Sequence, residues 1–182
     1  IAATLDRFGD RFRNRVFTIT SGIGFVVGFA MFGSIVYLSI YLQVVSGSSP
    51  TVAGLQLLPL MAGLLFTSIL SGRLITRTGN YKPYPIIGTA LATAGLFMLS
   101  QLTSSTPYWQ IAMAMLVLGA GLGNVMQVLV LAVQNSVEPR DIGTATSGST
   151  FFRSMGGAFG TAVFGAVWAA RLATEMVVIM PS

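Results

Sequence analysis

Gly72-Arg-Leu-Ile-Thr-Arg-Thr-Gly-Asn-Tyr-Lys82 is a short basic segment between two long apolar runs. It holds three of the ten basic residues of the chain, two glycines and no acid. Lysine and arginine in a short connector between apolar runs mark the cytoplasmic side of a membrane. The stretch therefore predicts a connection between two membrane-spanning helices and gives the chain an orientation.

The composition around this stretch is that of a membrane protein. Of the 182 residues, 53% are hydrophobic and only 8% are charged, and the mean hydropathy is +0.78. A soluble domain carries about 25% charged residues. Several apolar runs reach about 20 residues, which is enough for a helix to cross a hydrocarbon core roughly 30 Å thick. We therefore expect an all-α, multi-pass membrane protein whose first partner is the lipid bilayer.

We expect five membrane spans, preceded by a cytoplasmic linker at 1–16 and followed by an external tail at 171–182. Ser49 and Thr106 each precede a proline, an arrangement typical of the first turn of a helix, and so they mark where the second and fourth spans begin. The expected spans cover about 17–45, 51–75, 84–102, 108–134 and 142–170.

The basic residues orient these spans. Eight of the ten fall before the first span, between the second and third, or between the fourth and fifth, whereas the other connectors are uncharged. This asymmetry predicts a cytoplasmic N-terminus and an external C-terminus in the cytoplasmic, or inner, membrane. It also explains the net charge of +5 without a nucleic-acid partner. The eight residues are Arg7, Arg11, Arg13, Arg15, Arg73, Arg77, Lys82 and Arg140.

The residue types exclude most catalytic chemistry. The chain has no cysteine and no histidine, so thiol chemistry and the commonest metal and haem ligands are absent. All five acids lie outside the expected spans. Without a paired acid, a nucleophile beside a base or a metal constellation, neither an enzyme nor a cofactor site is expected.

Arg153 is the one charged residue expected inside a span. It lies about eleven residues into the fifth span, which at roughly 1.5 Å per residue places it near the middle of the hydrocarbon. A charge there costs at least ~2.5 kcal/mol on insertion scales, so Arg153 should face a cavity or a partner. Either it acts in coupling or substrate contact, or it bonds to backbone carbonyls of a neighbouring helix and is structural.

Two amides on the fourth span, Asn124 and Gln127, project from one side of the helix at a spacing of three. Uncharged amides in a membrane helix bind a ligand or hold helices together by hydrogen bonds. Both roles are open for each residue.

Polar residues also mark the first two spans. Tyr37 and Tyr41 share one face of the first span because they are four residues apart. Gln56 in the second span precedes Pro59, which frees a backbone carbonyl and bends the helix. Such a bend serves transport folds, but it is equally explained by packing. These residues complete the candidate set for a substrate cavity or coupling site.

Three glycine pairs at a spacing of four predict close approach between helices. They are Gly24 with Gly28, Gly119 with Gly123, and Gly156 with Gly160.

The basic stretch from Gly72 to Lys82 resembles the cytoplasmic loop signature of the major facilitator superfamily. This signature reads Gly-x-Leu-x-Asp-Arg-x-Gly-Arg-Lys and follows the second helix of each half. Thr76 stands where the signature has an aspartate, and Asn80 where it has an arginine. The departure at Thr76 removes the charge that would form an electrostatic latch. The matching residues are Gly72, Leu74, Arg77 and Gly79.

Longer runs extend the resemblance over nearly the whole chain. Together they look like the C-terminal half of a fourteen-span drug:proton antiporter of the EmrB/QacA type, from the ninth to the thirteenth span. The runs are Phe12-Arg-Asn-Arg-Val-Phe17, Leu55-Gln-Leu-Leu-Pro-Leu60, Val125-Met-Gln-Val-Leu-Val-Leu131 and Ala145-Thr-Ser-Gly-Ser-Thr-Phe-Phe-Arg-Ser-Met-Gly-Gly157.

This resemblance implies most of a C-terminal six-helix bundle from an alternating-access exporter, which moves amphiphilic small molecules outward and uses a proton gradient as its energy source, with no cofactor. Its partner would be the N-terminal half of the same transporter, which in this family carries most proton-coupling acids. Two other functions remain open: export of a specific metabolite, peptide or siderophore on the same fold, or a non-transporting membrane subunit or scaffold.

Overall fold

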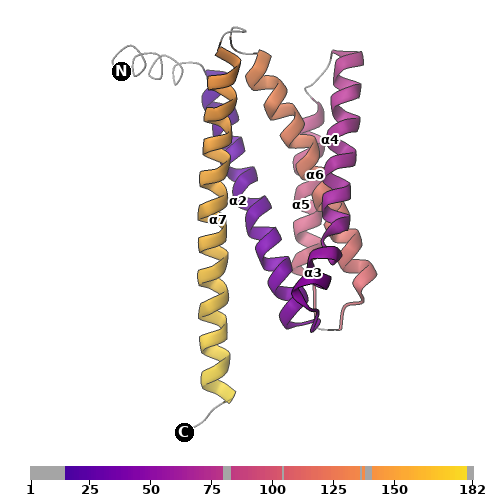
Figure 1. Cartoon of the computed structure of the whole chain (residues 1–182), viewed down its shortest axis with the longest axis vertical. Coiled ribbons are helices and arrows are strands. Elements are labelled where there is room, and N and C mark those ends of the chain that lie inside the picture. The colour runs from indigo at the N-terminus through magenta and orange to yellow at the C-terminus, as the bar shows by residue number, and fades with distance from the viewer. Residues whose placement is uncertain (1–14, 80–82, 104, 136, 138–140, 180–182) are drawn as a thin grey trace, which may run out of the picture.

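The computed structural model describes residues 15–79, 83–103, 105–135, 137 and 141–179 (Figure 1). Every regular element in these ranges is a helix, which confirms the all-α fold. The helices are α2 (Arg15–Val44), α3 (Pro50–Gln56), α4 (Leu58–Thr78), α5 (Pro83–Ser100), α6 (Tyr108–Asn135) and α7 (Ile142–Ile179).

Within the described residues, four helical stretches are long and apolar enough to cross a membrane, and they match the first four expected spans. The fifth expected span lies in α7, which is 38 residues long but is not among the four. Its glycines, serines and threonines and Arg153 lower its hydropathy, so its crossing stays a prediction. The four stretches are Thr18–Val44, Pro50–Thr78, Pro83–Ser100 and Tyr108–Asn135.

The helices form two groups, as Figure 1 shows: α7 runs alongside α2, and α4 and α5 pack on α6. A buried apolar cluster includes residues of both groups, among them Leu38 and Leu42 of α2 and Met115 and Leu118 of α6. The central helix of the second group is α6, because its transmembrane stretch is the most buried of the four. The predicted inner end is the end of the bundle at which α4 ends with Thr78 and Gly79.

Glycines bring the backbones of α2 and α7 together. A Cβ atom at Gly156 would collide with the carbonyl oxygen of Phe25, and one at Gly160 with that of Phe29. From the other side, a Cβ atom at Gly28 would collide with the carbonyl oxygen of Arg153. Side chains at these positions would push the helices apart, so the predicted close approach is confirmed for Gly28, Gly156 and Gly160. It is not confirmed for Gly24, where a Cβ atom would lie 3.6 Å from a side-chain carbon of Leu129, an ordinary contact.

The α4–α6 contact has the same construction. Cβ atoms at Gly119 and Gly123 would meet the carbonyl oxygens of Leu60 and Leu64, and one at Gly63 would lie 2.5 Å from the carbonyl oxygen of Leu116. The predicted pair Gly119 and Gly123 therefore lies in a close helix contact.

The second span is broken at Leu57, between α3 and α4. The Leu57 N–H donates to the Gly54 carbonyl at 3.2 Å, an i to i−3 bond that tightens the turn. Pro59 follows with no N–H to donate to Leu55, so the regular ladder stops there. The predicted bend is confirmed.

The helix ends differ from the sequence-based boundaries. The second span does not end near residue 75, because α4 continues to Thr78, so Gly72, Leu74 and Arg77 are helical and do not lie in a loop. The Thr76 and Thr78 hydroxyls donate to the carbonyls of Gly72 and Leu74, which satisfies them within the helix. Arg77 in the last turn also suits the helix dipole.

Gly79 ends α4 because its φ of 68° is a left-handed conformation that favours glycine. Asn80 and Lys82 lie outside the described residues, as do Arg7, Arg11, Arg13 and Arg140 and most of the expected linker. At the other terminus α7 continues to Ile179, past the expected end of the fifth span at residue 170.

Candidate functional site

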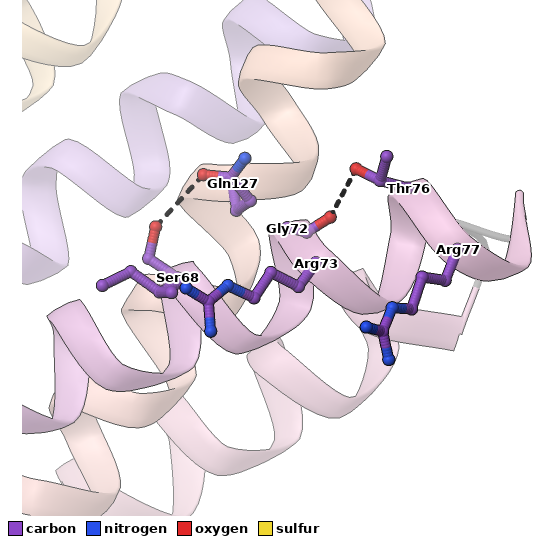
Figure 2. Close-up of a pocket in the computed structure, with 7 residues that line it drawn as sticks. Ser68, Gly72, Arg73, Thr76, Arg77 and Gln127 are labelled. Atoms are coloured by element: carbon purple, nitrogen blue, oxygen red, sulfur yellow. Dashed lines mark hydrogen bonds between the residues drawn. The ribbon is translucent and has the colours of Figure 1, made fainter.

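A groove of about 620 Å³ opens between α4 and α6 near the predicted inner end, and we call it the inner groove (Figure 2). Among the described residues, its lining holds two arginines, two hydroxyls and one amide, and no acid. Its lining consists of Ser68, Ile69, Gly72, Arg73, Thr76, Arg77 and Gln127.

Residues from two separate sequence predictions, the loop signature and the amide Gln127, line the inner groove. The Ser68 hydroxyl donates to Gln127 Oε1 at 3.1 Å, which fixes the amide against α4. A Cβ atom at Gly72 would lie 3.1 Å from Gln127 Nε2, so the signature glycine leaves room for the amide. Gly72, Arg77 and Gln127 therefore line one site.

Arg73 was missed as a site residue by the sequence analysis. It lies one turn before Arg77 on the same face of α4, and both side chains are exposed. The spacing of four between two arginines was the available signal. Leu74, the remaining helical signature residue, is also exposed but does not line the groove.

Asn124 lies one turn before Gln127 on α6 but faces α5. A Cβ atom at Gly88 would lie 3.0 Å from the Asn124 Cβ, and the asparagine is only 8% exposed. Its Oδ1 atom is buried and finds no hydrogen-bond partner among the described residues. Because a buried acceptor without a partner costs free energy, Asn124 remains a candidate for polar contact with a further group.

Arg153 lines a small, mostly enclosed cavity of about 20 Å³ between α2, α6 and α7. Three hydroxyl residues of α7, Thr146, Ser149 and Thr150, line it too, so the arginine lies on a small polar face, as its spacing to them predicts. The backbone of Arg153 packs against Gly28, near the middle of the 30-residue α2. This contact supports the predicted depth in the membrane.

The structure does not bring Arg153 into the inner groove. The small cavity is closed on the α6 side by apolar residues, including Met126 and Leu129, and in the described part of the chain it shares no lining residue with the inner groove. Arg153 and Gln127 therefore belong to two different sites on opposite sides of the bundle's central helix.

The two tyrosines have different surroundings. Tyr41 is 5% exposed and donates its hydroxyl to the Thr103 carbonyl at 2.7 Å, so it ties α2 to the connector after α5. Tyr37 lines a cavity of about 220 Å³ with Ser34 and Phe164, and its ring centroid lies 6.4 Å from that of Trp168. Tyr37 is thus open to a ligand, whereas Tyr41 supports the helix packing.

Gln56 lies at the predicted outer end, as the last residue of α3. Its Oε1 accepts a hydrogen bond from the Ser48 hydroxyl at 3.1 Å, and its backbone carbonyl accepts one from the Tyr108 hydroxyl at 3.0 Å. These bonds hold the connector before α3 and the start of α6, and they place Gln56 away from the inner groove.

Comparison with known proteins supplies the family context. A family model described as Major Facilitator Superfamily matches residues 2–161. The chain is 47% identical over 157 residues to an uncharacterized MFS-type transporter of Mycobacterium tuberculosis, covering 86% of the chain and 23% of that protein. It is 38% identical over 160 residues to the multidrug transporter protein MdtP of Bacillus subtilis, covering 88% of the chain and 29% of that protein.

A third relative is a tetracycline resistance determinant of Streptomyces rimosus, 33% identical over 152 residues, with 84% of the chain and 44% of that protein covered. The chain therefore spans less than half the length of each of these relatives.

Proposed function

We propose that this chain, which belongs to the major facilitator superfamily, forms part of a proton-coupled exporter of amphiphilic small molecules. Membership makes it a multi-pass membrane transporter segment and not an enzyme. The observation that carries the proposal is that 84% and 88% of the chain align with relatives named for tetracycline resistance and multidrug transport. The energy source in this proposal is the proton gradient across the cytoplasmic membrane.

The helix packing supports a place in one half of such a transporter, and we assign it to the C-terminal half of the fourteen-span type on the sequence resemblance alone. Transporters of this fold are built from inverted three-helix repeats. With α2, α3–α4 and α5 as one repeat and α6 and α7 as the start of the next, the α2–α7 and α6–α4 contacts are equivalent. Both are close contacts made by glycines facing carbonyl oxygens. On this assignment a sixth helix and an N-terminal half complete the transporter.

Reconstitution tests this function. Vesicles that contain the full-length transporter should move a fluorescent amphiphilic cation when a pH gradient is imposed, and movement should stop when a protonophore collapses the gradient. Vesicles that contain only residues 1–182 should show no such movement because the proton-coupling acids are proposed to lie in the other half. Gradient-driven movement by the isolated chain would contradict the assignment to a half, and a folded full-length protein without gradient-driven movement would contradict export.

Cysteine labelling tests the orientation. Thr78 and Ser46 are both exposed and lie at opposite ends of the bundle, and the chain has no cysteine of its own. In a full-length protein without other cysteines, Thr78→Cys should resist an impermeant thiol reagent in intact cells and react after lysis. Ser46→Cys should react in intact cells. The reverse pattern would invert the topology.

A further inference from the structure

We propose that the inner groove binds the phosphate headgroup of an anionic lipid from the cytoplasmic leaflet, with the lipid's acyl chain lying along α4. The leaflet follows from the proposed orientation. The binding chemistry itself rests on the residues of the groove and does not depend on what the transporter exports.

The charge of the groove calls for an anion. Arg73 and Arg77 lie one turn apart on the same face of α4, a spacing at which like charges repel each other. None of the described residues that line the groove is acidic, and Thr76 lines it with an uncharged hydroxyl. A guanidinium group binds phosphate oxygens through paired N–H bonds, so one phosphate can relieve both charges.

The groove also offers an uncharged hydrogen-bond donor, the amide of Gln127. Ser68 holds the Oε1 atom of Gln127, and the Nε2 atom lies on the side of Gly72 (Figure 2). The amide of Gln127 therefore offers N–H donors from α6 to the groove whose α4 side carries Arg73. Donors from α4 and α6 thus face one groove, an arrangement that suits an anion with several acceptor oxygens.

The surface that leads to the groove favours a lipid over free phosphate. Leu65, Ile69, Arg73 and Arg77 follow one another at a spacing of four along α4 and form one ridge. Leu65 and Ile69 are 59% and 56% exposed, and they lie toward the middle of a helix long enough to cross the bilayer. The ridge therefore runs from apolar to basic in the same order as an acyl chain and its headgroup, and free phosphate would use only the basic end.

Basic recesses between membrane helices on the cytoplasmic side are known to bind anionic headgroups. Each basic residue near an anionic surface contributes enough to change affinity about fivefold. Removing both arginines should weaken binding more than removing either one, but not by the product of the two single effects, because the arginines share one phosphate.

Native mass spectrometry of the full-length transporter in detergent tests the proposal. The protein is titrated with phosphatidylglycerol and, separately, with phosphatidylcholine of the same chains, and inorganic phosphate serves as a competitor. We expect preferential binding of phosphatidylglycerol, a loss of about fivefold in each of Arg73→Gln and Arg77→Gln, and weak competition by phosphate. Arg171→Gln is the matched control, because Arg171 is exposed and lies toward the end of α7 that is far from the inner groove. The affinity of this variant for phosphatidylglycerol should equal that of the wild type.

Two further measurements are needed. One distinguishes a loss of binding from a loss of folding, and the other distinguishes a bound lipid from another occupant of the groove. Arg73→Lys keeps the charge and should retain part of the preference, and thermal unfolding checks that each glutamine variant is folded. Equal binding of the two lipids by the wild type would overturn the proposal and would indicate that another part of the transporter covers the ridge. Competition by inorganic phosphate at the same concentration as the lipid would also overturn it and assign the groove to a soluble anion. Neither result bears on proton-driven export, which the vesicle assay measures separately.

Discussion

Replacing Gly156 by alanine is expected to reduce the yield of folded full-length transporter and to lower its unfolding temperature. The new Cβ atom would collide with the carbonyl oxygen of Phe25, a backbone atom that cannot turn aside as a side chain can. Relief requires α7 to move away from α2, which loosens the contact along both helices. Overpacking of this kind costs about 1–3 kcal/mol.

The matched control is Gly165→Ala on the same helix. Gly165 is exposed, and nothing lies within 4 Å of the position its Cβ would take. Both substitutions gain up to about 1 kcal/mol of helix propensity, so the difference between the two variants reports the collision. Fluorescence-detected size-exclusion chromatography after heating gives the unfolding temperatures. Equal temperatures for the two variants would mean that α2 and α7 do not approach as closely as the structure describes.

The sequence predicted the positions of the first four spans better than the helices against which each of them packs. Hydropathy and the proline starts located the first four spans because length and apolarity are properties of each segment alone. The spacing of Gly156 and Gly160 indicated a close contact, but it carried no information on which carbonyl would face each glycine. That choice depends on the register between α2 and α7, which only the packed helices define.

The end of the second span shows a different limit. Composition marked Gly72–Lys82 as a connector because it is basic and polar, yet most of its described residues are helical. The hydroxyls of Thr76 and Thr78 donate hydrogen bonds to carbonyls of their own helix, so these polar residues do not end the helix. Gly79 was the better boundary signal, since a left-handed glycine commonly follows the last helical residue.

The candidate site was predicted only in part. Gln127 was singled out for its position on α6, and Gly72 and Arg77 for the signature, but their meeting depends on how α4 packs against α6. Counting residues along the fifth span gave the depth of Arg153. The same counting could not place Arg153 and Gln127 on different sides of α6, because the rotation of each helix is set by its neighbours.

Replacing Arg153 by alanine in the full-length transporter is expected to reduce efflux driven by an imposed pH gradient by about ten- to a hundredfold. Hydrogen bonds that involve a charged group contribute about 1.5–3 kcal/mol, which corresponds to this range. The position itself supports a role in transport, because a charge level with the middle of α2 opposes insertion by ~2.5 kcal/mol or more. Removing the charge of Arg153 should therefore leave the expression level of the transporter normal or raise it.

A structural role for Arg153 predicts the opposite pattern. If the guanidinium only bonds to carbonyls of a neighbouring helix, Arg153→Ala should lower the unfolding temperature and leave efflux per folded molecule unchanged. Arg153→Lys separates charge from shape, because lysine keeps the charge but lacks the planar fork of donors. The control is Arg171→Ala on the same helix, where the arginine is exposed and lies outside the cavity. Normal efflux and normal unfolding temperature in both Arg153 variants would remove the residue from the mechanism and leave its position in the membrane without a function.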